Sequence, residues 1–271
     1  MNNEEGQYYI EAVEYFDKQE FDRAILSATK AINLNPDFAP AYSVRGTAHY
    51  GKEEYLKSID DHTNAIKFTK KMEAVIRSEI PESNNDNINK ILNELTKSKA
   101  FDYFHRGNAY DDIDDFKNAE KDFSEAIKLY PEFANAYNSR GIVYNKNADY
   151  ISAIEDFTKA IQYKYTKLAF SYNNRASAFQ HLERYEEAIK DCQKAIEIDP
   201  AYAHAYNTCG LTYEAMNDYE NAGIFYKKAI AIDPGYSTAK KNLETLGKKR
   251  LTFGSSVSVS LNSGINFLED E

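Results

Sequence analysis

The chain has 271 residues and a formal net charge of −10, which argues against a nucleic-acid backbone as its partner. No apolar run approaches the roughly 20 residues of a membrane-spanning helix, so membrane insertion is not expected. The first nine residues contain acidic but no basic side chains, and no secretory signal is therefore expected.

The sequence repeats itself with a period of 34 residues, in units 5–38, 39–72, 100–133, 134–168, 169–202 and 203–236. Position 8 is Ala or Gly in every unit, position 17 is aromatic, and position 27 is Ala followed by Ile. Position 4 is always tyrosine: Tyr8, Tyr42, Tyr103, Tyr137, Tyr172 and Tyr206. Such a period indicates a helical solenoid, in which each unit buries its apolar face against its neighbours.

These six copies resemble the tetratricopeptide repeat family over residues 5–236. The chain departs from the family pattern with Tyr where Trp is frequent, with Arg at position 7 where Leu is usual, and with Lys70 and Tyr165 in place of the proline of position 32. The resemblance implies an all-α fold, namely a right-handed superhelical solenoid of six helix–turn–helix units with a C-terminal capping helix. It also implies binding rather than catalysis.

The predicted organisation places repeats 1–2 at residues 5–72 and repeats 3–6 at residues 100–236. Between them, residues 73–99 are predicted to form an inserted, extended helical hairpin with a polar loop at 82–87, because apolar residues recur at helical spacing on both sides of that loop. The two apolar stripes either pack on each other or provide a partner or dimer surface. Residues 237–250 are predicted to be the capping helix, with Ala239, Leu243 and Leu246 facing the last repeat. Residues 251–271 are predicted to be a flexible, acidic-ended tail, or alternatively a ligand of the chain's own groove.

Positions 7 and 23 hold an arginine and an aspartate together in repeats 2–5, and both positions lose these residues in repeats 1 and 6. This joint pattern predicts four ion pairs inside the repeats: Arg45 with Asp61, Arg106 with Asp122, Arg140 with Asp156, and Arg175 with Asp191. The competing interpretation directs the arginines into the groove toward an acidic ligand.

Two cysteines, Cys192 and Cys209, occupy core positions 24 and 7 of successive repeats. We expect buried free thiols in a reducing compartment, and therefore a cytoplasmic protein, rather than a disulfide or a nucleophile.

The family resemblance implies that a ligand lies in the concave groove, along positions 2, 5, 6, 9, 12 and 13 of each first helix. In the first three repeats these positions are mainly apolar and include the candidate binding residues Tyr9, Phe16, Phe101 and Phe104. In the last three repeats they are mainly amides and hydroxyls with almost no charge, Lys146 being the main exception, and the candidates are Asn135, Asn138, Ser139, Asn145, Asn173, Asn174, Asn207 and Thr208. Asn138, Asn173 and Asn207 all fall at position 5 and form a predicted ladder for a peptide backbone. Alternatively, the amides are ordinary polar surface and the rings pack inside the N-terminal layer.

The groove lacks the Lys and Arg residues of the dicarboxylate clamp by which some tetratricopeptide co-chaperones hold acidic chaperone tails. No phosphate loop and no His/Cys cluster with metal spacing is present in the sequence, so we expect no enzyme, no catalytic residue, no cofactor and no metal. The favoured function is an adaptor that binds extended peptide segments of a partner protein. The alternative is a structural protein that associates with itself through the 73–99 hairpin or the tail, as a homo-oligomer.

Overall fold

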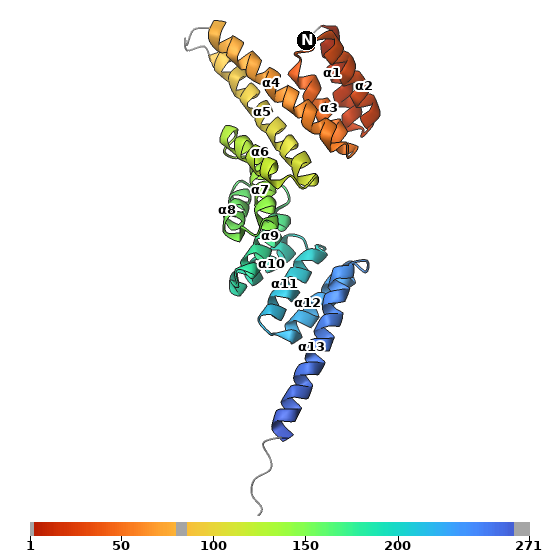
Figure 1. Ribbon diagram of the computed structural model, residues 1–271, viewed down its shortest axis with the longest axis vertical. Coiled ribbons are helices and arrows are strands. Elements are labelled where there is room, and N and C mark those ends of the chain that lie inside the picture. Colours follow the sequence, from red (N-terminus) through yellow and green to blue (C-terminus); the bar gives the residue numbers. More distant parts are fainter. Residues whose placement is uncertain (1–2, 80–85, 263–271) are drawn as a thin grey trace, which may run out of the picture. The chain divides into compact units, whose positions relative to one another are not determined.

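The computed structural model describes residues 3–79 and 86–262, with side chains up to Lys249, and these ranges contain thirteen α-helices and no strand. The helices are α1 (Glu4–Asp17), α2 (Phe21–Leu34), α3 (Ala39–Gly51), α4 (Tyr55–Glu79), α5 (Asp86–Asp112), α6 (Phe116–Leu129), α7 (Ala134–Lys146), α8 (Tyr150–Gln162), α9 (Leu168–His181), α10 (Tyr185–Ile198), α11 (Ala203–Ala215), α12 (Tyr219–Ile232) and α13 (Ser237–Asn262) (Figure 1). The predicted all-α class is confirmed.

The helices form two compact units, Met1–Asp149 with α1–α7 and Tyr150–Glu271 with α8–α13. In the first unit α1/α2, α3/α4 and α5/α6 are the two-helix hairpins of repeats 1–3, and the first helices α1, α3, α5 and α7 contact one another in succession. In the second unit α9/α10 and α11/α12 are the hairpins of repeats 5 and 6, and α13 packs on α12 and α11. Each repeat therefore contacts its sequence neighbours, as a helical-repeat architecture requires.

The residue at position 8 matches the size of the residue at position 24 of the same repeat. An added Cβ would lie 3.0 Å from the His62 ring at Gly46, 2.8 Å from the Phe123 ring at Gly107 and 2.5 Å from the Tyr226 ring at Gly210. Where position 24 is small, position 8 carries a methyl group, in the pairs Ala12–Ala28 and Ala176–Cys192. Glycine is thus needed only where a ring enters between the two helices.

In the second and sixth repeats the tyrosine of position 4 binds the turn that precedes its repeat. The hydroxyl of Tyr42 donates to the backbone carbonyl of Pro36 at 3.1 Å, and that of Tyr206 donates to Pro200 at 3.2 Å. Lys70 replaces the turn proline before the third repeat, and its Nζ donates to the Tyr103 hydroxyl at 2.9 Å. A hydroxyl on a large ring explains the preference for tyrosine here, because the ring packs and its tip binds a polar group.

Of the four predicted ion pairs, the structure brings together three, each with two hydrogen bonds between the guanidinium and the carboxylate. The Arg45–Asp61 distances are 2.8 and 2.7 Å, the Arg106–Asp122 distances 2.7 and 2.8 Å, and the Arg175–Asp191 distances 2.7 and 2.9 Å. In the first repeat the same two positions hold Glu11 and Ser27, and the Ser27 hydroxyl donates to the Glu11 carboxylate at 3.0 Å. Arg140 and Asp156 belong to different units, and their pairing stays a prediction.

The same arginines also join successive repeats. Their Nη1 groups donate to the hydroxyl at position 25 of the preceding repeat, at 2.9–3.1 Å, in the pairs Arg45–Thr29, Arg106–Thr63, Arg140–Ser124 and Arg175–Thr158. These guanidinium groups are engaged inside the repeat core, which argues against a role in holding an acidic ligand.

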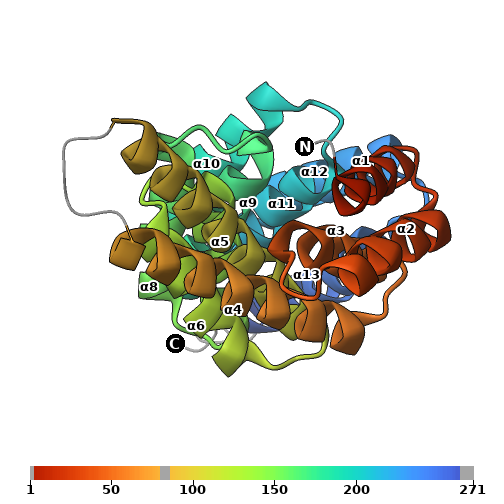
Figure 2. The ribbon, with the colours of Figure 1, turned by 90° about the horizontal axis from the view of Figure 1, so that it is seen from above.

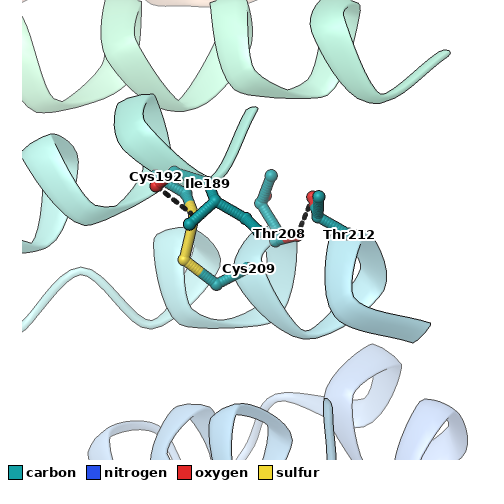
Figure 3. Close-up of a disulfide and its surroundings, with 5 residues drawn as sticks. All are labelled: Ile189, Cys192, Thr208, Cys209 and Thr212. Carbon is teal, nitrogen blue, oxygen red and sulfur yellow. Dashed lines mark hydrogen bonds between the residues drawn. A yellow bond between two sulfur atoms is a disulfide. The ribbon is translucent and has the colours of Figure 1, made fainter. Parts of the chain in front are cut away.

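The expectation of two free thiols was wrong, because Cys192 and Cys209 form a disulfide (Figure 3). Cys192 lies in α10 at position 24 of repeat 5, and Cys209 lies in α11 at position 7 of repeat 6. Their Cα atoms are 5.7 Å apart across the interface between these repeats, and both side chains are fully buried. This Cα separation lies in the range that a disulfide spans. The cysteines therefore give no support to a reducing compartment.

Helices α4 and α5 are the longest pair of the first unit and lie side by side in both views (Figures 1 and 2). Lys99 of α5, nearly buried, donates to Glu73 of α4, and Thr96 donates to the same carboxylate at 3.4 Å. The polar loop expected at 82–87 lies almost entirely outside the described residues.

Helix α13 buries Ala239 and Leu246 and packs Leu243 against Ala222 and Tyr226 of the last repeat. It continues to Asn262 rather than ending at 250, so its helical part includes twelve residues that were expected in the tail. No proline interrupts residues 251–262, and the single Gly254 does not end the helix. The remainder of the predicted tail lies outside the described residues.

Candidate functional site

A cleft of about 470 Å³ lies on the face that α1, α3 and α5 form in the first unit. Its apolar lining comes from the groove positions of repeats 1–3, and consists of Tyr9, Val13, Phe16, Pro40, Val44 and Phe101. The Phe101 ring is 45% exposed and packs on Phe133, with ring centroids 4.8 Å apart. The cleft therefore presents apolar surface formed by three successive repeats.

Phe104, the fourth predicted ring of this half, has a structural position instead. It packs against Phe123 and Phe133, at ring-centroid distances of 6.0 and 5.0 Å, and belongs to the core between α5, α6 and α7. Phe104 therefore packs between repeats 3 and 4 and does not line the cleft.

The same cleft has a polar side formed by Ser43, Thr47, Ser98, Asp102 and His105. Asp102 is only 2% exposed, and its Oδ1 lies 2.9 Å from Nδ1 of the fully buried His62. Its second oxygen, Oδ2, has no hydrogen-bond partner among the described residues. The cleft thus combines an apolar wall with one buried carboxylate that has an unused acceptor.

His105 also lines the cleft and stacks on His62, the partner of Asp102, with ring centroids 5.5 Å apart and an angle of 14° between the rings. Burial, together with the charge of His62, lowers the pKa of His105 to about 3. His105 is therefore neutral at neutral pH and adds no positive charge to the cleft.

The amide residues at position 5 are buried rather than exposed: Asn138 is 4%, Asn173 8% and Asn207 5% exposed. In the second unit the side-chain amide of Asn242, in α13, donates to Oδ1 of Asn207 at 3.0 Å. Asn173 hydrogen-bonds the hydroxyl of Tyr202, while its Oδ1 has no partner among the described residues. Burial raises the pKa of Tyr202 to about 12, so the hydroxyl is protonated at neutral pH.

The other predicted amides and hydroxyls have mixed positions. Thr208 is buried, and the half-buried residues are Asn135, Ser139, Asn145 and Asn174. Asn138 lies in the first unit and Asn173 and Asn207 lie in the second, so the continuous ladder stays a prediction.

A row of stacked rings lies beside the amides of the second unit. Phe170 stacks on Tyr202 at 4.7 Å, Tyr202 on His204 at 5.4 Å, and His204 contacts Tyr236 at 4.6 Å between ring centroids. Phe170 is 42% exposed, so this row ends in accessible aromatic surface.

Sequence reasoning missed the acidic side of the cleft. Position 3 of the other repeats from the second onward is a small residue, at Ala41, Ala136, Ser171 and Ala205, whereas the third repeat has Asp102. That departure from the repeat was the available signal.

In the described ranges, no group of three or more His, Cys, Asp or Glu side chains is arranged to hold a metal ion. Within the same ranges, none of the helices has the length and apolar character needed to cross a membrane.

Models of the tetratricopeptide repeat match residues 100–133, 134–166, 169–202 and 203–236. Among solved structures, the chain is similar to the Cut9–Hcn1 hetero-tetramer of the APC/C, with a TM-score of 0.65 and 16% identity over 88% of this chain and 42% of that one. The chain thus spans less than half the length of that protein.

It is also similar to YrrB, a tetratricopeptide repeat protein with an unusual peptide-binding site, with a TM-score of 0.58 and 21% identity over 79% of this chain and 96% of that one. The C-terminal part of a TPR repeat-containing protein from Cytophaga hutchinsonii has a TM-score of 0.63 and 16% identity over 89% of this chain and 85% of that one. At these identities the likeness establishes the fold. The repeat commonly mediates protein–protein interactions through its concave surface. With four consecutive matched repeats and the same helical architecture, the chain belongs to the tetratricopeptide repeat family.

Proposed function

We propose that this chain is a protein-interaction adaptor that binds an extended segment of a partner protein along the first helices of its repeats. The observation that carries the proposal is the cleft of about 470 Å³ between α1, α3 and α5, which is lined by the apolar groove residues of three repeats. Clefts with a mainly apolar lining and a few polar groups are where proteins usually bind ligands.

In the second unit, the amide of Asn173 supports the same function. Its Oδ1 is buried, lacks a partner among the described residues and lies on a first helix next to the stacked Tyr202. An unsatisfied buried acceptor is unfavourable, and a backbone N–H of a bound peptide satisfies it. In this proposal the apolar cleft of the first unit anchors side chains of a ligand, and the amide of Asn173 in the second unit binds a ligand backbone.

The test begins with selection of binders to the full chain from a random 12-residue peptide library displayed on phage. The affinity of the strongest binder, carrying a fluorescent label, is then measured by anisotropy. Ser43→Trp fills the cleft with a large side chain, and we expect it to weaken binding at least about tenfold. Ser78→Trp is the matched control, because both serines donate to a carbonyl of their own helix but Ser78 lies exposed on α4.

A second pair of variants tests the amides. For a peptide that binds the second unit, Asn173→Ala is expected to weaken binding by about a factor of ten, because a hydrogen bond to the ligand is lost. Gln162→Ala removes an exposed amide at the end of α8 and is expected to leave the affinity unchanged. Equal affinities of Ser43→Trp and Ser78→Trp would place binding outside the cleft and contradict the proposal.

One observation favours a second candidate function, self-association through the 73–99 hairpin. Its arms expose Val75 (44%) and Ile91 (50%), and Met72 next to them is 42% exposed. Exposed apolar side chains on two neighbouring helices favour such an association surface. Light scattering across a hundredfold range of concentration tests this function, which predicts a dimer mass that Val75→Lys/Ile91→Lys returns to the monomer mass.

A further inference from the structure

Asp102 is the one charged residue at a position that the other repeats from the second onward fill with alanine or serine. The side chains at that position, in Ala41, Ala136, Ser171 and Ala205, are fully buried, and Asp102 is itself only 2% exposed. Burying a carboxylate is unfavourable unless its oxygens are paired. The packing of the repeat therefore does not account for an acid here.

His62 accounts for one of the two oxygens. Its Nδ1 lies 2.9 Å from Oδ1 of Asp102, while Oδ2 has no partner among the described residues. Asp102 lines the cleft, and no lysine or arginine stands among the residues that line the cleft with it. Its neighbour His105 is neutral at neutral pH, because burial lowers its pKa to about 3. Among the lining residues, Asp102 therefore has no lysine, arginine or charged histidine as a partner, and its contact with His62 uses only Oδ1.

We infer that the cleft receives a lysine or arginine side chain of the bound segment, with Oδ2 of Asp102 accepting a hydrogen bond from the cationic head. Val13 and Val44 line the same cleft and contact the aliphatic stem of that side chain. Long basic side chains combine an apolar stem with a charged tip, which matches a cleft of apolar wall and acidic floor.

The overall charge of the chain agrees with a basic ligand. At a net charge of −10 the protein attracts basic segments and repels acidic ones over the distance at which partners first meet. The inference rests on the proposed function, and adds to it the chemical class of the side chain that the cleft selects.

The test uses the library described above. We expect the peptides selected by the full chain to share a lysine or arginine at one fixed position flanked by apolar residues. The strongest binder is then synthesised with that residue intact and with norleucine in place of lysine, or citrulline in place of arginine. The replacement keeps the stem and removes the charge, and it is expected to weaken binding at least about tenfold.

Asp102→Asn keeps the size of the side chain and removes its charge. In this variant the ratio of the two peptide affinities is expected to fall to near one. Asp60→Asn removes an exposed charge from α4 and is expected to leave the ratio as it is in the wild type. If Asp102→Asn does not fold, the comparison of the two peptides on the wild-type chain still decides.

Four results would overturn the inference, and they separate it from the proposed function. Selected peptides without a fixed basic residue, equal affinity of the wild type for the charged and neutral peptides, or an unchanged ratio in Asp102→Asn leave peptide binding intact and reject the cation site. Selection of no peptide at all rejects the proposed function together with the inference.

Discussion

Cys209 occupies in the sixth repeat the position that arginine has in repeats 2–5. Its disulfide with Cys192 links the sixth repeat to the fifth, just as those arginines link their repeats to the preceding ones. In the earlier repeats the arginine donates to a hydroxyl of the preceding repeat, as Arg45 does to Thr29. The sixth repeat has Phe225 in place of the aspartate that positions the arginine. A covalent link thus replaces a hydrogen-bonded one at the last joint between repeats.

Reduction of this disulfide is expected to destabilise the second unit. The two cysteines are 17 residues apart in the sequence, and cross-links that close loops of this size stabilise proteins by about 3 kcal/mol. Thermal unfolding followed by circular dichroism, with and without dithiothreitol, measures the difference. The variant Cys192→Ala/Cys209→Ala is the control and should not respond to the reductant. Two titratable thiols in the denatured chain before reduction would contradict the disulfide.

Breaking one ion pair from one side is expected to be more costly than removing both partners. In Arg106→Met the carboxylate of Asp122, which is 2% exposed, loses both of its guanidinium hydrogen bonds, and the free energy of unfolding falls by about 3 kcal/mol. Arg106→Met/Asp122→Leu leaves no buried charge and is expected to lose less. Urea unfolding of the two single variants and the double variant gives the coupling energy, and purely additive losses would reject a direct pair.

Part of the Arg106 effect belongs to the joint with the preceding repeat, and a third variant separates it. Thr63→Val keeps the shape of the side chain and removes the hydroxyl that accepts from Arg106 at 2.9 Å. The free energy of unfolding of Thr63→Val is expected to fall by about 1 kcal/mol, the usual contribution of one hydrogen bond. A value near zero would show that the arginine acts only within its own repeat.

A methyl group at Gly107 is expected to destabilise the third repeat. The added Cβ would lie 2.8 Å from the Phe123 ring, so the ring or the helices must shift, and overpacking of this kind costs about 1–3 kcal/mol. Phe123→Leu in the same chain should recover part of the loss. Gly247→Ala is the control, because nothing lies within 4 Å of its Cβ position, and alanine there should stabilise α13 by up to about 1 kcal/mol.

Repeat periodicity predicts contacts that recur, and the structure shows why. Positions 7 and 23 lie opposite each other in every two-helix hairpin of this kind, as Arg45 and Asp61 do. Residues at these two positions therefore change together from repeat to repeat, and this joint change reveals the pair. The hydrogen bond from Arg45 to Thr29 also recurs, but it connects two successive repeats. A comparison of positions within single repeats therefore does not reveal it.

Features that occur once are harder to predict from a repeat. The disulfide, the extension of α13 to Asn262 and Asp102 of the cleft do not recur from repeat to repeat, so no second copy shows their purpose. Burial of Asn138, Asn173 and Asn207 was also missed, because a groove position predicts the direction of a side chain but not how closely the neighbouring helix covers it.

The half-buried His105 is expected to make the chain less stable in acid. Its pKa is about 3 in the folded protein and about 6.5 in an unfolded chain, so the unfolded state binds the proton first as the pH falls. The stability that neutral His105 provides is fully present above pH 6.5 and is lost between that pH and about 3, reaching a loss of about 2 kcal/mol at pH 5. Glutamine does not titrate in this range. Between pH 7 and pH 5 the free energy of unfolding of His105→Gln should therefore fall by about 2 kcal/mol less than that of the wild type, as measured by urea unfolding at both pH values. His181→Gln, an exposed histidine stacked on Tyr150, should keep the wild-type dependence. Identical pH dependence in the wild type and His105→Gln would mean that His105 takes up its proton equally in the folded and unfolded chains.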